Sequence, residues 1–381
     1  MKQNHIIISI AVASVLALGA CSRATTSSRP TEAIADSTLC VKYATGFSVD
    51  YCTEYKRVTI QNPWNKGEIW ATYYLIKSDS TQTPADGIRV RIPIGTIAVT
   101  SCTHYAFVDA IGEIGSITGV CNPDLAYNAT IRQRFANGTI CSLGDAFDTN
   151  IERLLALKPD ALMIAGYNRQ DGNSQRLQSS GIPLIYNNEW TESTALARAE
   201  WVKLVAAFYD KETLACTLFD SIESNYRQAA NAARAATQKP TIMVGGNFKG
   251  TWYMPGGKSY MAQLFADAGA DYFYNNDTST VSLPLNFETV LHHFAQADVW
   301  LNAPTATLEA LFAMDTRHKL FKAAKNGDVY GFYARTHEGG ANDFWESGVV
   351  HPDLILKDLV WALHRNLMKD YQPTYINKLT H

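Results

Sequence analysis

Residue types that support catalysis occur in this chain, but their spacing does not assemble a catalytic site. Ser101 and His104 lie three residues apart with no partner acid indicated, whereas a nucleophilic serine needs a base that a third group orients. His292 and His293 follow Glu288, but adjacent residues of a helix point in different directions, which favours a surface over a metal site. The chain has no GxSxG, P-loop or HExxH motif. The sequence therefore predicts a protein that is not an enzyme and has no intrinsic cofactor or metal.

Cys21 has the most specific chemistry of any residue in the sequence. It follows an apolar run from Ile6 to Leu18 that is too short for a bilayer, which needs about 20 apolar residues. Leu18-Gly19-Ala20-Cys21 matches the lipobox of bacterial lipoproteins, in which the cysteine receives a diacylglycerol. The alternative is an ordinary signal peptide followed by a chance cysteine. We expect a signal peptide over residues 1–20, a lipid on Cys21 and a flexible tether over 21–38. This predicts an exported, membrane-anchored lipoprotein that faces the periplasm or the cell exterior.

The composition is that of a globular protein without a nucleic-acid partner. The 381 residues are 46% hydrophobic and 18% charged, with a net charge of -3 and no basic run. An oxidising compartment permits disulfides, and Cys40 with Cys52 would close a hairpin. The candidates for one more bridge are Cys102, Cys121 and Cys141. Buried free thiols are the competing interpretation.

Short apolar strands alternate with helical segments through most of the chain. The start, from Cys40 to Ser78, has a β-like pattern with a turn over residues 62–67. Later strands are expected at residues 94–100, 117–120, 161–164, 182–186, 241–244, 298–301 and 329–332. Between the fourth and fifth of these lies a long helical region that Lys239-Pro240 ends. This order predicts an α/β fold with mostly parallel sheets covered on both faces. We expect an N-terminal lobe over residues 39–205, a long connecting helix over 206–238 and a C-terminal lobe over 239–381.

Two segments of the sequence echo each other, one in each expected lobe. Asn150 begins a short helix before the strand KPDALMI, and Asn286 begins another before QADVWLN. Asn is a good N-cap, and Glu152 and Glu288 in the first turns favour the positive end of the helix dipole. Because the echo occurs once per lobe at comparable places, it suggests two Rossmann-like lobes related by approximate symmetry.

Several segments appear in an order that resembles a known family. They are the strand 97–99 with the segment TSCTH, then NIERLLALKPDALMIAG, then GTWYMPGGKSYMAQLFADAGA, and finally HEGGANDFWESGVVHPDLILKDL. From Arg91 to Leu367 the chain resembles the substrate-binding lipoproteins of ABC importers for ferric siderophores, haem and cobalamin. The resemblance implies two α/β lobes joined by one rigid helix, the class III binding-protein fold, with the ligand in the cleft between them. It also implies that Glu152 and Glu288 dock onto arginines of the permease dimer. The simplest members have no counterpart to the segment 40–78.

Ligand-binding residues are expected on the loops that follow the strands, at the interface of the lobes. In the first lobe the candidates are Thr103, His104, Tyr167, Asn168 and Arg169. In the second lobe they are Lys249, Trp252, Tyr253, Arg335, His337, Asn342 and Trp345. Aromatic rings would cover the apolar body of a chelate or macrocycle, and the arginines would pair with anionic groups. The competing interpretations are that Trp252 and Trp345 pack within their own lobe and that His104 is a hydrogen-bonding residue at a helix start.

The leading functional hypothesis is a receptor for a ferric siderophore, with cobalamin or haem as alternative ligands. Its partners would be an ABC permease dimer with its ATPase, the metal chelate, and the membrane through the lipid anchor. A receptor for a bare metal ion would need convergent side chains such as His104, His337 and Asp343. An exported hydrolase or metal-processing enzyme, and an adhesion or structural lipoprotein, are the alternatives from other classes.

Overall fold

A computed structural model of the chain describes residues 35–168 and 172–380. The expected signal peptide, the lipid on Cys21 and most of the tether lie outside the described residues, as does Arg169. No helix in the described ranges is both long and apolar enough to span a bilayer.

The β-like start of the chain forms a separate five-stranded sheet, as the pattern predicted. Its strands are ordered as in the sequence, antiparallel except for the parallel pair β4 and β5. They are β1 (Ser37–Thr38), β2 (Phe47–Tyr51), β3 (Lys56–Gln61), β4 (Ile69–Ile76) and β5 (Ile88–Arg91). Alternate residues of β2 and β3, among them Val49 and Val58, are fully buried, so one face of the sheet packs on the rest of the protein.

Buried hydrogen bonds fix this N-terminal sheet to the lobe that follows it. The carboxylate of Glu200 accepts the backbone N–H groups of Lys42, Tyr43 and Ala44 at 2.6–2.9 Å. On the other side the buried hydroxyl of Tyr73 donates to the carbonyl of Leu184 at 2.8 Å. Because a buried carboxylate or hydroxyl without partners would cost free energy, these contacts hold the sheet in one position.

The N-terminal lobe has a parallel sheet in the order β12-β11-β6-β7-β8. The strands are β6 (Ile97–Val99), β7 (Ile117–Val120), β8 (Cys141–Ser142), β11 (Ala161–Ile164) and β12 (Leu184–Tyr186). Val99 and Met163 belong to one hydrophobic cluster, whereas Ala98 and Leu162 belong to another. Successive residues of a strand point to opposite faces, so the sheet is covered on both sides. The covering helices are α1 (Cys102–Ala110), α2 (Ala129–Ala136), α3 (Ile151–Leu157) and α4 (Gly172–Gln178).

The C-terminal lobe repeats this plan with a shorter parallel sheet and adds an antiparallel one. The parallel strands, in the order β16-β13-β18, are β13 (Thr241–Val244), β16 (Asp271–Tyr272) and β18 (Val299–Leu301). The antiparallel strands, in the order β14-β15-β17, are β14 (Asn247–Phe248), β15 (Thr251–Pro255) and β17 (Ser282–Leu285). The main helices are α8 (Tyr260–Asp267), α9 (Phe287–Phe294), α10 (Leu308–Met314) and α12 (Pro352–Leu363). The sequence indicated β13 and β18 but neither β16 nor the antiparallel sheet. The strand expected at 329–332 is the two-residue β19 (Tyr330–Gly331), which pairs antiparallel with β20 (Asn377–Lys378).

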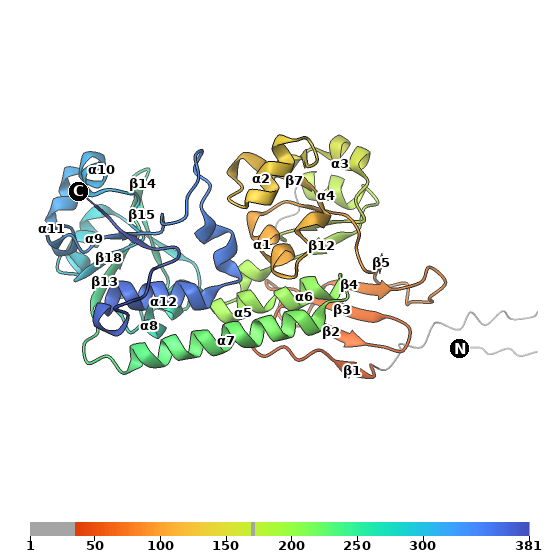
Figure 1. The fold of residues 1–381 in the computed structure, drawn as a ribbon, viewed down its shortest axis with the longest axis horizontal. Helices are drawn as coiled ribbons and strands as arrows, with labels where there is room; N and C mark the ends of the chain where they lie inside the picture. The colour runs from red at the N-terminus through yellow and green to blue at the C-terminus, as the bar shows by residue number, and fades with distance from the viewer. Residues whose placement is uncertain (1–34, 169–171, 381) are drawn as a thin grey trace, which may run out of the picture. The chain divides into compact units, whose positions relative to one another are not determined.

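One long helix, α7 (Glu212–Arg234), packs against elements of both lobes. Figure 1 shows it passing α6 (Val202–Ala207) and then α8 and α12. Its buried face includes Phe219, Ile222 and Tyr226, at the spacing of a helix that packs on one side. The helix is shorter than the expected 206–238, because Asp210 takes a left-handed conformation (φ 58°) and ends the preceding helical segment. This is the class III architecture that the resemblance implied.

The expected disulfides are not formed. Cys40 is a free thiol, and the register of β1 and β2 places it opposite Ser48 rather than Cys52. Four residues of strand separate those positions by about 13 Å, beyond the reach of a disulfide, whose Cα atoms lie within about 7 Å. Cys102, Cys121 and Cys141 are separate thiols with their own hydrogen-bonding partners. These cysteines are therefore free thiols, but the alternative of buried free thiols fits Cys121 alone, since Cys102 and Cys141 are partly exposed and Cys40 is exposed.

Candidate functional site

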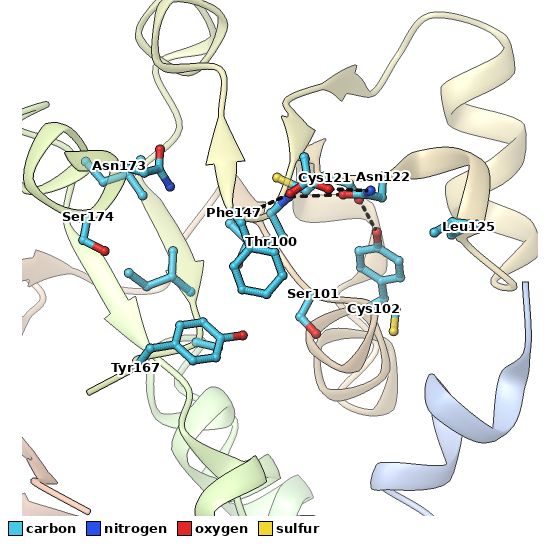
Figure 2. A pocket seen from close by; sticks show the side chains of 16 residues that line it. Thr100, Ser101, Cys102, Cys121, Asn122, Leu125, Phe147, Tyr167, Asn173 and Ser174 are labelled. Atoms are coloured by element: carbon cyan, nitrogen blue, oxygen red, sulfur yellow. Dashed lines mark hydrogen bonds between the residues drawn. The ribbon is translucent and has the colours of Figure 1, made fainter. Parts of the chain in front are cut away.

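A cavity of about 350 Å³ opens at the carboxyl ends of three parallel strands of the N-terminal lobe. Thr100, Ser101 and Cys102 follow β6, Asn122 follows β7 and Tyr167 follows β11. Parallel strands deliver their carboxyl ends to the same edge of the sheet, which is where α/β proteins bind ligands. Figure 2 shows these side chains around a common space, with Asn173 and Ser174 of α4 on one side and Leu125 on the other.

Two exposed aromatic rings form one wall of this cavity. Phe147 is 67% exposed and Tyr167 is 47% exposed, and their ring centroids lie 5.6 Å apart. Both rings project into the space in Figure 2. Burial, with a smaller contribution from the Glu189 carboxylate, raises the pKa of Tyr167, so its phenol stays neutral and can donate a hydrogen bond. The wall therefore offers flat apolar surface together with a polar handle.

The turn that presents Phe147 is held by hydrogen bonds. It connects the short strands β9 (Gly144–Asp145) and β10 (Asp148–Thr149). The carboxylate of Asp145 accepts the backbone N–H of Phe147 at 2.8 Å, and the side chain of Asn122 accepts the N–H of Ala146 at 3.2 Å. Asn122 also donates to Asp145 at 3.2 Å, so the turn is anchored to the end of β7. Phe147 is thus positioned before any ligand arrives.

The polar groups of this cavity are mostly neutral. Asp145 is the single charged side chain among the lining residues that the structure describes, and none of them is Lys, Arg or His. Burial raises the pKa of Cys102 to about 12 and that of Cys121 to about 11, so both remain protonated and are poor metal ligands. The side-chain oxygen of Asn173 is buried without a hydrogen-bond partner in the described part of the chain. The site fits a flat ligand with neutral hydrogen-bonding groups.

A second cavity, of about 510 Å³, has the opposite character. It lies between α1 and α2 of the first lobe and the segment 335–351 of the second. Its charged and imidazole side chains are Asp109, Arg132, Arg335, His337, Asp343, Glu346 and His351. Arg335 pairs with the buried Asp343 at 2.7 Å. The carboxylate of Glu346 accepts the N–H groups of Tyr127 and Asn128 at 2.8 and 2.9 Å, which joins the two lobes.

Burial of Glu346 raises the pKa of its carboxyl to about 7. The nearby Asp343 raises it further, whereas the two backbone donors and Arg132 lower it. Arg335 pairs with Asp343 within the second lobe, and Arg132 donates to the carbonyl of Tyr127 within the first. We infer that Glu346 joins the lobes and that these other charged groups are already engaged rather than available to a ligand.

The ligand site was expected in the cleft between the lobes, but the aromatic cavity is lined by residues of the first lobe alone. The predicted ligand residues divide between this cavity, the charged cavity and a third place. Tyr167 lines the aromatic cavity, and Asn168 is exposed beside it. Arg335 and His337 line the charged cavity instead. Thr103 and the half-exposed Trp345 line a small gap of about 90 Å³ between the lobes.

Other predicted residues contribute elsewhere. Lys249 and Tyr253 are exposed on the β14–β15 hairpin and line none of the three cavities. Asn342 uses its side chain to donate to the carbonyl of Phe332 at 2.7 Å. Its role is to hold the backbone of the segment 332–342.

Two predicted ligand residues are wrong, because the structure buries them. Trp252 is fully buried, its indole N–H donates to the carbonyl of Val244 at 2.7 Å, and its ring packs on Trp300 and Phe321. His104 is also buried, and that burial lowers the pKa of its imidazole to about 3, so the ring is neutral. For Trp252 the competing interpretation made from the sequence fits. The helix that contains His104 is capped by Ser101 instead, and the Nδ1 of His104 has no hydrogen-bond partner among the described residues.

Phe147 and Trp190 were not predicted, although both lie at the aromatic wall. Trp190 is 42% exposed, and its ring centroid lies 5.5 Å from that of Tyr167. It follows the end of β12, so the rule that ligand residues follow strands would have found it. Phe147 sits on a turn between two-residue strands, for which the sequence carries no such signal.

Glu152 and Glu288 occupy equivalent places in the two lobes. The side chain of Asn150 caps α3 by accepting the N–H of Arg153 at 2.9 Å, and that of Asn286 caps α9 through Thr289 at 2.8 Å. Both glutamates are exposed in the first turn, and Glu288 lies 3.6 Å from Arg317. Because asparagine does the capping, neither carboxylate is needed for it.

No group of three or more His, Cys, Asp or Glu side chains that would suit a metal ion occurs within residues 35–168 and 172–380. Two of the three side chains suggested for a bare-metal site are engaged elsewhere. His104 is buried in the core, and Asp343 pairs with Arg335.

Comparisons with known proteins agree with this fold. A family model described as periplasmic binding protein matches residues 97–336. An uncharacterized lipoprotein of Methanocaldococcus jannaschii is 27% identical over 358 residues, which cover 86% of this chain and 83% of the relative. Among solved structures, a periplasmic haem-binding protein of Pseudomonas aeruginosa has a TM-score of 0.56 at 15% identity and covers 76% of this chain and 99% of its own. The molybdate-binding protein MolA of Haemophilus influenzae has a TM-score of 0.55 at 17% identity, covering 73% and 89%. At such low identity these structures establish the fold alone.

Proposed function

Because the chain belongs to the periplasmic binding protein family, we propose that it captures an iron complex, a ferric siderophore, in the aromatic cavity and delivers it to an ABC permease. The family consists of solute-binding proteins of ABC transporters rather than enzymes, and the relative from Methanocaldococcus jannaschii is named as a lipoprotein. The observation that carries the choice of ligand is the cavity at the strand ends, with its exposed Phe147 and Tyr167 and its neutral polar lining.

The lining of the cavity narrows the chemistry of the complex. A volume of about 350 Å³ lies at the small end of the range for ligand pockets, so the cavity suits part of a large complex. Asp145 would repel carboxylates, and the described lining supplies no cation to pair with them. This supports a ferric chelate with little net negative charge, or the corrinoid of the cobalamin alternative, over haem with its two propionates.

An exported hydrolase or metal-processing enzyme is less well supported. Ser101 lies in the aromatic cavity, but its hydroxyl is hydrogen-bonded to the hydroxyl of Thr103 at 2.9 Å and accepts the N–H of Thr103 at 3.3 Å. His104 is buried in the core, so it does not serve as the base that such a serine needs.

Glu152 and Glu288 are proposed as the contacts with the permease. Their two carboxylates are exposed, one on each lobe. If each forms an ion pair with an arginine of the permease dimer, the two contacts fix the orientation of the receptor on the permease. The lipid proposed on Cys21 would keep the receptor near that permease and raise its effective concentration.

The direct test is a ligand screen with the chain from Ser22 onward. Haem, cyanocobalamin, a ferric tris-hydroxamate and a ferric tris-catecholate would be titrated, and thermal unfolding and tryptophan fluorescence would be followed. A bound complex raises the melting temperature by mass action, and we expect the largest shift with the tris-hydroxamate. No shift with any of the four would contradict the proposal.

The permease contact has a separate test. The double variant Glu152→Ala/Glu288→Ala should lose uptake in cells while its affinity for the complex stays unchanged. A loss of affinity would contradict the docking role, and Glu309→Ala on α10 is a matched control in the first turn of another helix.

A further inference from the structure

Aromatic rings continue from the aromatic cavity onto the N-terminal sheet. The ring centroids of Phe147 and Tyr167 lie 5.6 Å apart, those of Tyr167 and Trp190 5.5 Å, and those of Trp190 and Trp64 6.3 Å. The row continues from Trp64 to Trp70 at 5.0 Å and from Trp70 to Tyr186 at 5.8 Å. We call the six residues Phe147, Tyr167, Trp190, Trp64, Trp70 and Tyr186 the aromatic row.

The row runs from the surface to the edge of the hydrophobic core, because Trp70 and Tyr186 are partly buried and pack against core residues. Phe147, Tyr167 and Trp190 are exposed, and Trp64 and Trp70 are partly exposed. Large apolar side chains gathered in one exposed row mark interaction sites more often than chance surface residues do. The exposed rings meet at tilted angles of 34–51°, so they do not stack face to face on one another.

The N-terminal sheet holds its two tryptophans in fixed places. The side chain of Asn62 accepts the backbone N–H groups of Trp64 and Asn65 at 3.0 and 3.1 Å, which closes the β3–β4 turn. Trp70 lies on β4, whose Tyr73 donates its buried hydroxyl to Leu184 and accepts the N–H of Tyr186 at 3.0 Å. The sheet is therefore registered against β12, the strand that leads to Trp190.

From this continuity we infer that Trp64 and Trp70 of the N-terminal sheet form a second part of the ligand site, which takes a flat aromatic group attached to the metal complex. The inference rests on the proposed function, because the row begins with the two rings that line the aromatic cavity. A complex too large for the cavity of about 350 Å³ extends beyond it. Trp190 contacts both Tyr167 and Trp64, so the apolar surface is continuous from the cavity to the N-terminal sheet. Stacking on such rings gives free energy beyond that of simple burial. The added sheet then serves to select complexes that carry an aryl group.

The test uses two ferric tris-hydroxamate complexes that differ only in a naphthyl group on a flexible linker. We expect the naphthyl group to raise the affinity of the unmodified protein roughly 5- to 20-fold. In Trp64→Ala that gain should shrink to about twofold or less. Trp64→Tyr, which keeps a ring, should recover most of it. Phe147→Ala should weaken both complexes alike, because that ring lines the cavity itself. Phe273→Ala, an exposed ring (53%) on the other lobe, is the matched control.

The outcomes separate this inference from the proposed function. If neither complex binds, the proposed function fails. If both bind and the naphthyl group gives the same gain in Trp64→Ala as in the unmodified protein, the inference is overturned and the proposed function stands. A Trp64→Ala variant that loses uptake but keeps the naphthyl gain would show that the row contacts another protein, which also overturns the inference. Thermal unfolding of each variant checks that a lost gain does not come from a lost fold.

Discussion

The aromatic cavity and the charged cavity border the same lobe, yet they use their side chains in opposite ways. The charged cavity is larger, but its Arg335 is paired with Asp343 and its Glu346 is bonded to the backbone of the other lobe. The aromatic cavity keeps Phe147 and Tyr167 exposed, and the side-chain oxygen of Asn173 has no hydrogen-bond partner within residues 35–168 and 172–380. Groups already paired hold a structure together, whereas exposed rings and unsatisfied polar atoms are available to a ligand. We therefore propose the smaller of these two cavities as the ligand site.

The largest expected effect comes from removing the aromatic wall. Phe147→Ala/Tyr167→Ala should weaken binding of the preferred metal complex roughly 10- to 100-fold, because two exposed rings stop covering its apolar body. Isothermal titration calorimetry measures the change, and Tyr253→Ala, an exposed ring on β15, is the control. Equal affinities in the double variant and the control would contradict the proposal that the aromatic cavity binds the ligand.

The pH dependence of stability should identify Glu346 as a lobe-joining group. Its folded pKa of about 7 lies above the ordinary value of 4.5, so the folded state holds a proton more tightly than the unfolded chain does. Stability should therefore fall as the pH rises from about 4.5 through about 7, by about 3 kcal/mol.

Urea unfolding at pH 5 and pH 8 would measure this fall. Glu346→Gln cannot titrate and should lack this part of the pH profile. If the unmodified protein and the variant have the same pH profile, Glu346 does not titrate as its burial requires.

Arg335→Ala should cost stability without costing affinity. The substitution leaves the buried Asp343 without its cation, but Arg335 is about half exposed, so we expect a loss of roughly 1–2 kcal/mol. Urea unfolding gives the stability, and titration of the metal complex gives the affinity. Arg335→Lys tests whether a positive charge beside Asp343 is enough to keep the stability. A large loss of affinity would mean that this arginine pairs with the ligand after all.

The smallest expected effect is that of Arg132→Gln on ligand binding. Arg132 lines the charged cavity, and its guanidinium donates to the carbonyl of Tyr127. We expect the affinity to change by about twofold or less, since a rim charge distant from a ligand contributes little. A pronounced loss, with an increased dependence on salt, would indicate an anionic ligand in the charged cavity.

Trp252 and Tyr167 show how far the sequence could go. Both follow or lie near strands in glycine-containing segments, and both were expected to line the cleft. Tyr167 instead lines the aromatic cavity of the N-terminal lobe, because it follows the parallel strand β11 directly. Trp252 does not, because it lies on β15, in an antiparallel sheet that the sequence did not indicate and that turns its ring into the core.

The features that could be predicted are local ones. The buried strands, the asparagine caps before Glu152 and Glu288, and the β-rich start each depend on neighbouring residues. The aromatic wall depends on contacts between distant segments, such as that of Trp190 with Trp64. Hydrophobic periodicity within one segment does not predict contacts between distant segments.

The most direct measurement is a crystal structure of the protein with a ferric complex, with the iron located by anomalous scattering. Our account predicts an iron peak at the aromatic cavity, with the organic part of the complex against Phe147 and Tyr167. An iron peak beside Arg132 and Arg335, with the aromatic cavity empty, would contradict it.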